Sequence, residues 1–151
     1  MVILIRHAEK GTEPPSDPPL SPAGSARAQD LVTALADAGV TAIVTSDRRR
    51  TRETAAPMAK ARHLEPVEIG RPDGSLARHV AAVAAEVRRH PGGVVLVVGH
   101  TDTLPEIVTA LGGPAIGAMP DAEYGNLYTL VSGPEGWRLV RTRYGAPDPG
   151  N

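Results

Sequence analysis

The most constraining feature of this sequence is the regular alternation of short apolar runs with longer segments of helical spacing. The mostly apolar runs cover residues 2–5, 40–44, 66–69 and 94–98. Strands that alternate with helices are joined by crossover connections. Such connections make neighbouring strands parallel and place helices on both faces of the sheet.

The C-terminal third of the chain breaks this alternation. Two β-rich runs, 127–131 and 137–144, flank the segment "SGPEG" at 132–136, which is typical of a hairpin. The sequence therefore predicts an α/β fold: a three-layer α/β/α sandwich with a mostly parallel central sheet and an antiparallel C-terminal hairpin. The length of 151 residues suits one domain over 1–151, with a flexible tail from about residue 145.

Several residues mark the expected helix boundaries. Ser21 followed by Pro22 is typical of a helix start, and Gly39 is typical of its end. A second helix is expected to begin near Ser46 or Asp47. Pro57 should kink or interrupt it, because proline removes a backbone donor. Two further helices are expected over 76–87 and 104–111.

The composition excludes several classes of function. A formal net charge of -1 provides no basic field for nucleic acid or an anionic membrane. The absence of cysteine excludes disulfides and thiolate chemistry. The apolar runs are too short to span a bilayer, and the N-terminus lacks the pattern of a signal peptide. We therefore expect a cytoplasmic protein with no nucleic-acid or membrane partner.

Charged and polar residues follow three of the apolar runs directly. They are Arg6-His7 after the first run, Thr45-Ser46 and a cluster of arginines after the second, and Gly99-His100-Thr101-Asp102 after the fourth. In open α/β sheets, ligands bind beyond the carboxyl ends of the strands. We therefore expect these groups to converge at one edge of the sheet.

Two histidines beside two arginines suit the transfer of a phosphoryl group. Guanidinium groups offer paired donors for phosphate oxygens and stay charged near neutral pH. One neutral imidazole can attack phosphorus and carry the phosphoryl group. The other, when protonated, can stabilise the charge of the transition state. No metal ion or cofactor is required if arginine and histidine supply the positive charge.

Each of these segments also has a simpler interpretation. Arg6-His7 alone would fit a solvated turn, the arginine cluster a solvated helix face with an Arg49–Glu53 pair, and Thr101 or Asp102 a helix cap. The joint placement at three strand ends favours a site. The other histidines, His63, His79 and His90, are interpreted as helix-surface residues.

The segments "LIRHAEK", "LSPAGSARAQDL", "VTSDRRRTRETA" and "VVLVVGHTDTLP" together resemble the histidine phosphatase superfamily, which includes phosphoglycerate mutases and phosphohistidine phosphatases. The resemblance covers residues 2 to about 112. It implies a phosphoglycerate mutase-like fold. One departure is Ala8, where the family usually has glycine.

The resemblance implies a role for each site residue. His7 corresponds to the phosphorylated nucleophile and Arg6 to the first phosphate clamp. Arg50 is selected over its neighbours because the family places this arginine four residues before the threonine of "ET", here Thr54. His100 corresponds to the second histidine. Backbone donors near Thr101 are expected to help hold phosphate.

The general acid is not specified by the sequence. Many relatives place a glutamate after the third strand, where this chain reads "VEIGRPDGS" without one. The candidates are Asp73, Glu9 and Asp102. Without a strong acid, a phosphohistidine substrate becomes attractive, because imidazole leaves easily.

The favoured function is a metal-independent phosphatase that hydrolyses a phosphomonoester through phospho-His7. The alternatives are a phosphohistidine phosphatase acting on a phosphoprotein, a phosphoglycerate mutase-type phosphotransfer, and a catalytically weak module that binds a phosphate ligand. A metal site built from His7, His100, Asp102 and Glu9 is disfavoured, because the adjacent arginines would repel a cation. The expected partner is a small phosphorylated metabolite or a phosphoprotein. The oligomeric state is left open.

Overall fold

A computed structural model describes residues 1–148, which form a six-stranded mixed sheet in the order β3-β2-β4-β1-β5-β6. The strands are β1 (Val2–Arg6), β2 (Ala42–Thr45), β3 (Val67–Glu68), β4 (Val95–Gly99), β5 (Asn126–Gly133) and β6 (Gly136–Arg143). The first four in chain order are parallel, and β5 and β6 form the antiparallel hairpin. The predicted fold class is confirmed.

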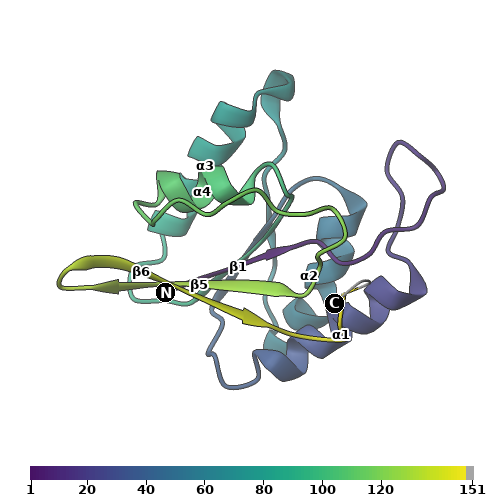
Figure 1. Ribbon diagram of the computed structural model, residues 1–151, viewed down its shortest axis with the longest axis horizontal. Coiled ribbons are helices and arrows are strands. Elements are labelled where there is room, and N and C mark those ends of the chain that lie inside the picture. The colour runs from purple at the N-terminus through teal and green to yellow at the C-terminus, as the bar shows by residue number, and fades with distance from the viewer. Residues whose placement is uncertain (149–151) are drawn as a thin grey trace.

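Helices cover both faces of this sheet (Figure 1). They are α1 (Pro22–Ala34), α2 (Arg49–Arg62), α3 (Leu76–Arg88) and α4 (Leu104–Ala110), with a short 3₁₀ helix, η1 (Pro72–Gly74), before α3. The apolar faces of α1 and α2 pack on one side of the sheet, and those of α3 and α4 pack on the other. Among residues 1–148, no helix is long and apolar enough to cross a membrane.

The start of α1 follows its sequence signal and brings the helix close to the first strand end. Ser21 is the N-cap, and its hydroxyl accepts from the backbone N–H of Gly24 at 3.1 Å. A Cβ atom on Gly24 would collide with the carbonyl of Glu9, so only glycine permits this approach. The helix is thereby packed against the segment that follows His7.

The second helix differs from the prediction at its start and in its interior. It begins at Arg49 rather than at Ser46 or Asp47, and the carboxylate of Asp17 accepts from the Arg49 N–H at 3.0 Å. A distant loop therefore supplies the cap. The helix also continues through Pro57 without interruption, because Ala55, Met58 and Ala59 are buried in the core on either side of the proline and hold the segment in place.

The segment before the C-terminus is anchored by Asp148, which is 3% exposed. Its carboxylate accepts from the backbone N–H groups of Tyr124 and Gly125 and pairs with Arg27 and Arg143. The flexible tail was predicted from about residue 145. Residue 148 is held in this way, and residues 149–151 of that tail lie outside the described residues.

Candidate active site

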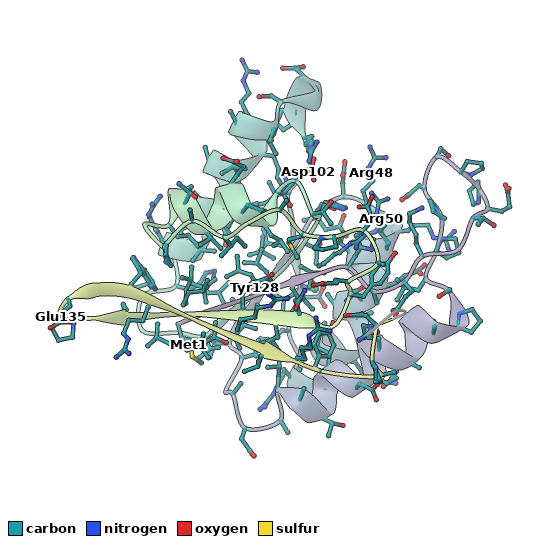
Figure 2. All side chains as sticks on the ribbon, in the orientation of Figure 1. Met1, Arg48, Arg50, Asp102, Tyr128 and Glu135 are labelled. Atoms are coloured by element: carbon teal, nitrogen blue, oxygen red, sulfur yellow. The ribbon has the colours of Figure 1, made fainter. Side chains whose placement is uncertain are left out.

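The carboxyl ends of the parallel strands border a cavity of about 600 Å³. All four residues expected at the site, Arg6, His7, Arg50 and His100, line it, and so does Thr101. Figure 2 shows Arg48, Arg50 and Asp102 in one region of the molecule, away from the hairpin turn at Glu135. The predicted convergence at one edge is therefore what the structure shows.

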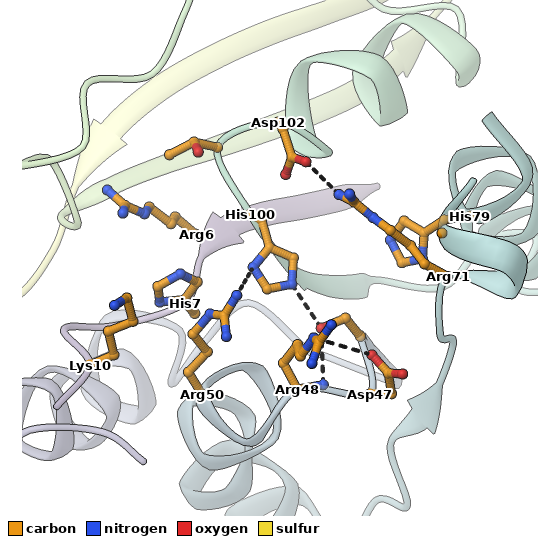
Figure 3. A pocket seen from close by; sticks show the side chains of 13 residues that line it. Arg6, His7, Lys10, Asp47, Arg48, Arg50, Arg71, His79, His100 and Asp102 are labelled. Atoms are coloured by element: carbon orange, nitrogen blue, oxygen red, sulfur yellow. Dashed lines mark hydrogen bonds and ion pairs between the residues drawn. The ribbon is translucent and has the colours of Figure 1, made fainter. Parts of the chain in front are cut away.

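The register of β1 and β4 places the two imidazoles next to each other. Arg6 pairs with Gly99 in this parallel ladder, and the N–H of His7 donates to the carbonyl of Gly99 at 2.9 Å. His7 and His100 are the next residues of their strands. Their ring centroids lie 5.3 Å apart in an edge-on arrangement (Figure 3).

Helical spacing brings Arg50 to the same point. The hydroxyl of Thr54 accepts from the N–H of Ala8 at 2.9 Å and donates to the carbonyl of Arg50 at 2.6 Å. Thr54 thus fixes α2 against the residue after His7. Arg50 lies one turn earlier on the same face, so its guanidinium reaches the cavity. This contact is a physical reason for the four-residue spacing between the two residues.

The ring of His7 is held in one tautomer. Its Nδ1 lies 2.8 Å from the carbonyl oxygen of Ala8, which can only accept, so Nδ1 carries the proton. Burial, together with the charges of Arg6 and Arg50, lowers the pKa of His7 to about 4 against the opposing Ala8 hydrogen bond. The imidazole is therefore neutral near pH 7, with the lone pair on Nε2.

His100 is also neutral, which differs from the protonated state expected for it. Burial lowers its pKa to about 3, and His7 and Arg50 contribute in the same direction. Its Nε2 contacts the hydroxyl of Ser46 at 2.8 Å, and its Nδ1 lies 3.5 Å from the Arg50 guanidinium, which can only donate. A bound dianion would raise this pKa again, because opposite charge favours the protonated ring.

Ser46 connects His100 to the start of α2. Its hydroxyl lies 2.9 Å from that of Thr51, which reaches the carbonyl of Arg48 at 2.8 Å. The Nε2–H of His100 donates to the Ser46 hydroxyl, which can donate in turn to the Thr51 hydroxyl. The Thr51 hydroxyl then donates to the carbonyl of Arg48. This chain of hydrogen bonds orients the His100 ring.

Arg6 is 6% exposed and is held by the loop before β5. Its Nη1 donates to the carbonyls of Pro120, Asp121 and Glu123 at 2.7–3.3 Å, and its guanidinium lies 4.1 Å from the centroid of the Tyr124 ring. These contacts fix the plane of the guanidinium at the edge of the cavity. The sequence contains no local signal for this loop.

Two buried donors distinguish the site from an ordinary polar surface. Among residues 1–148, the Nε atoms of Arg6 and Arg50 are buried and have no hydrogen-bond partner. Buried polar groups are normally satisfied, so two such cations around one hollow are arranged for an anion. The arrangement can therefore bind a phosphoryl group and offer it the Nε2 of His7 as a nucleophile.

None of the three candidate acids is a free carboxylic acid in the cavity. Glu9 forms a two-pronged pair with the buried Arg27 and does not line the cavity. Asp73 is exposed and pairs with Arg78 at 2.8 Å. Asp102 does line the cavity. Burial raises the pKa of its carboxyl, but the hydrogen bond and charge of Arg71 outweigh this, so its pKa is below the ordinary 3.8.

The structure adds residues that sequence reasoning missed. His79 was interpreted as a helix-surface residue, but it is 3% exposed and lines the cavity, and its Nδ1 donates to the carbonyl of Gly70 at 3.0 Å. Lys10 and Arg71 bring further positive charge to the same cavity, and so does Arg48, a member of the arginine cluster that was expected at this edge. The sequence argument considered only residues that directly follow strands, and Lys10 and Arg71 lie further along their loops.

The alternative metal site is not assembled. Its members Glu9 and Asp102 are each paired with an arginine. Within the part of the chain that the structure describes, no three His, Cys, Asp or Glu side chains group in a way that could hold a metal ion.

Comparison with known proteins agrees with this geometry. The family model for the histidine phosphatase superfamily (branch 1) matches residues 2–73, which include Arg6, His7 and Arg50. No curated protein is significantly similar to the chain in sequence.

Solved structures extend the comparison to the rest of the chain. Bacillus stearothermophilus YhfR has a TM-score of 0.71 at 19% identity, with 92% of this chain and 94% of that chain covered. A mycobacterial glucosyl-3-phosphoglycerate phosphatase in complex with VO3 has a TM-score of 0.67 at 20% identity, covering 97% and 99%. Phosphoserine phosphatase from Entamoeba histolytica has a TM-score of 0.62 at 16% identity, covering 97% and 96%. At these identities the similarity shows the fold.

Proposed function

We propose that the chain, whose residues 2–73 match the family model for branch 1 of the histidine phosphatase superfamily, is a metal-independent phosphatase of that family working through phospho-His7. The observation that carries the proposal is the neutral His7 ring, with its lone pair on Nε2, in a cavity lined by two guanidinium groups whose buried Nε donors are unsatisfied. Arg6 and Arg50 bind the phosphoryl oxygens, with His100 and the backbone near Thr101 as further contacts. The substrate class is a phosphomonoester of a small metabolite, as for the two named phosphatases above.

The proposed reaction has two steps. The lone pair of His7 Nε2 forms a bond to phosphorus while the bond from phosphorus to the leaving oxygen breaks; the electron pair stays on that oxygen, which takes up a proton from water. Water then attacks the phosphohistidine, the P–N bond electrons return to Nε2, and inorganic phosphate leaves. Fixed cations stabilise the charge on the phosphoryl oxygens in both steps.

Hydrolysis is favoured over mutase-type transfer because of the loop at residues 10–19. A mutase must shield its phosphoenzyme from water. Here the loop is anchored to α2 through Asp17, and the N–H of Leu20 donates to Glu53 at 2.7 Å. It extends outward beside α1 and α2 (Figure 1).

The first test is the replacement His7→Ala, assayed with 4-nitrophenyl phosphate in the presence of a chelator. We expect kcat to fall by about 10⁴-fold or more, since the nucleophile is removed. The wild-type protein, quenched during turnover, should carry acid-labile, base-stable phosphate on His7. His90→Ala, a change to a histidine paired with Glu86 outside the cavity, is the matched control and should retain activity. Undiminished hydrolysis by His7→Ala would refute the proposal.

A phosphohistidine substrate is the second candidate. The observation that favours it is the ion pairing of all three candidate acids, because a phosphorylated imidazole needs little help from a strong acid to depart. It predicts rapid dephosphorylation of a phosphohistidine protein and slow turnover of alkyl phosphates. Binding of phosphate or vanadate without any turnover would instead identify a phosphate-binding module.

A further inference from the structure

Five cationic and two anionic side chains line the cavity, and the cations extend beyond the hollow between Arg6 and Arg50 that is proposed to hold the phosphoryl group. Arg6 and Arg50 border the hollow itself. Arg71 lies on the other side of the His100 ring from His7 (Figure 3). Since His7 attacks from one side, the leaving group must extend away from it, and Arg71 is a cation available on the far side.

Arg71 is held in place by an ion pair with Asp102, which lines the same cavity. Its Nη2 donates to Asp102 Oδ2 at 2.5 Å, and both residues line the cavity. The Arg71 side chain is 35% exposed, so the group keeps access to solvent and to a ligand. Its charge also contributes to lowering the pKa of His100, which places it within electrostatic reach of the reacting centre.

The segment that bears Arg71, between β3 and α3, offers a cation and no proton donor. Its one carboxylate, Asp73, does not line the cavity and pairs with Arg78. A guanidinium cannot act as a general acid near neutral pH, but it stabilises a departing anion strongly. The site therefore suits a leaving group that departs as an anion and needs no proton.

We propose that the preferred substrate is a phosphoanhydride, whose leaving group is itself a phosphate held by Arg71. This proposal rests on the proposed phospho-His7 phosphatase chemistry, and it puts a phosphoanhydride in place of the phosphomonoester as the preferred substrate of the same site. His7 Nε2 attacks the terminal phosphorus and the bridging P–O bond breaks. The bond's electron pair stays on the departing phosphate, which leaves as an anion and takes up no proton. A phosphate monoester has a second pKa of about 6, so this anion is stable at neutral pH.

Charge also separates this substrate from the alternatives. An alkyl alcohol leaves as a strongly basic alkoxide unless an acid protonates it. A departing imidazole is neutral or cationic and gains nothing from a guanidinium. A second phosphate gains from Arg71, and Arg48 and Lys10 line the same cavity.

The experiment measures kcat/KM in the presence of a chelator for pyrophosphate, 4-nitrophenyl phosphate and glycerol phosphate. The wild-type protein should prefer pyrophosphate to glycerol phosphate by at least about tenfold. Arg71→Met should reduce kcat/KM for pyrophosphate by about 10–100-fold, the loss of one charged hydrogen-bonding group. The same change should alter 4-nitrophenyl phosphate hydrolysis by less than about threefold, because that leaving group carries no second phosphate.

Two further variants sharpen the comparison. Asp102→Asn releases Arg71 from its ion pair and should lower the KM for pyrophosphate. Arg78→Met is the matched control, because Arg78 forms an ion pair with Asp73 outside the cavity. This variant should leave all three rates unchanged.

The outcomes separate the two proposals. If 4-nitrophenyl phosphate is hydrolysed in a His7-dependent way but pyrophosphate shows no preference over glycerol phosphate, the phosphoanhydride proposal is wrong and the phosphatase proposal stands. An equal loss of both activities in Arg71→Met also overturns it, as that would indicate a general structural effect. If none of the three compounds is hydrolysed, both proposals fail.

Discussion

Partners that hydrogen-bond in only one direction fix the tautomers of the two imidazoles. The backbone carbonyl of Ala8 can only accept, so it holds the proton of His7 on Nδ1 and leaves Nε2 open. The Arg50 guanidinium can only donate to Nδ1 of His100, so the proton of His100 lies on Nε2, where the Ser46 hydroxyl accepts it. Ser46 is therefore expected to act as a positioning residue.

Replacing Ser46 by alanine should lower kcat/KM for an aryl phosphate by about tenfold, because the Nε2–H of His100 loses its acceptor and the ring is free to turn. The tautomer of His100, followed by ¹⁵N NMR of labelled protein, should change from predominantly Nε2–H to a mixture. Ser132→Ala, on the exposed hairpin, is the control. An Ser46→Ala protein with reduced thermal stability but an unchanged His100 tautomer would contradict the positioning role.

At the scale of elements, the site depends on segments that carry no reacting group. Arg27 on α1 joins Glu9, two residues after His7, to Asp148 near the C-terminus. Asp148 in turn holds the backbone of Tyr124 and Gly125, and the loop that ends there holds Arg6. Burial alone would lower the pKa of Arg27, but the hydrogen bond and charge of Glu9 raise it above its ordinary value. The network thus links α1, β1 and the C-terminal segment.

Asp148→Ala should weaken this link and release the loop that fixes Arg6. The buried Arg27 loses one of its two carboxylates, so the free energy of unfolding should fall by about 3 kcal/mol, measured by urea denaturation. At temperatures where the variant is still folded, vanadate binding should weaken and KM should rise more than kcat falls. Asp37→Ala, at an exposed position after α1, serves as the control. An unchanged vanadate Kd in folded Asp148→Ala would rule out the link to Arg6.

For the whole molecule, folding places two uncharged imidazoles beside several cations. The pKa of His7 falls from 6.5 to about 4 and that of His100 from 6.5 to about 3, in both cases chiefly through burial. Between pH 6.5 and these values the unfolded chain binds protons that the folded chain does not. The contribution of both groups to stability is therefore complete above pH 6.5 and is lost as the pH falls.

Denaturation of the wild-type protein in urea should show this loss between pH 7 and pH 4. His7 alone should account for a decrease on the order of 3 kcal/mol in the free energy of unfolding over this window. The double variant His7→Gln/His100→Gln cannot titrate at these positions and should show a flatter dependence on pH. If the variant and the wild type have the same pH profile, the two histidines are not the buried neutral groups described above.

The sequence by itself determined the sheet, its parallel core and the end at which Arg6, His7 and His100 meet, because strand signals and strand ends are local features of the chain. The spacing of Arg50 before Thr54 is equally local, since one helical turn puts both on one face. Only the tertiary structure decided that Asp17 caps α2 and that His79 is buried. It also decided that Glu9 pairs with Arg27 and that Asp102 holds Arg71 at the cavity. These contacts join residues far apart in the chain, and their energies depend on burial and charge that no local pattern encodes.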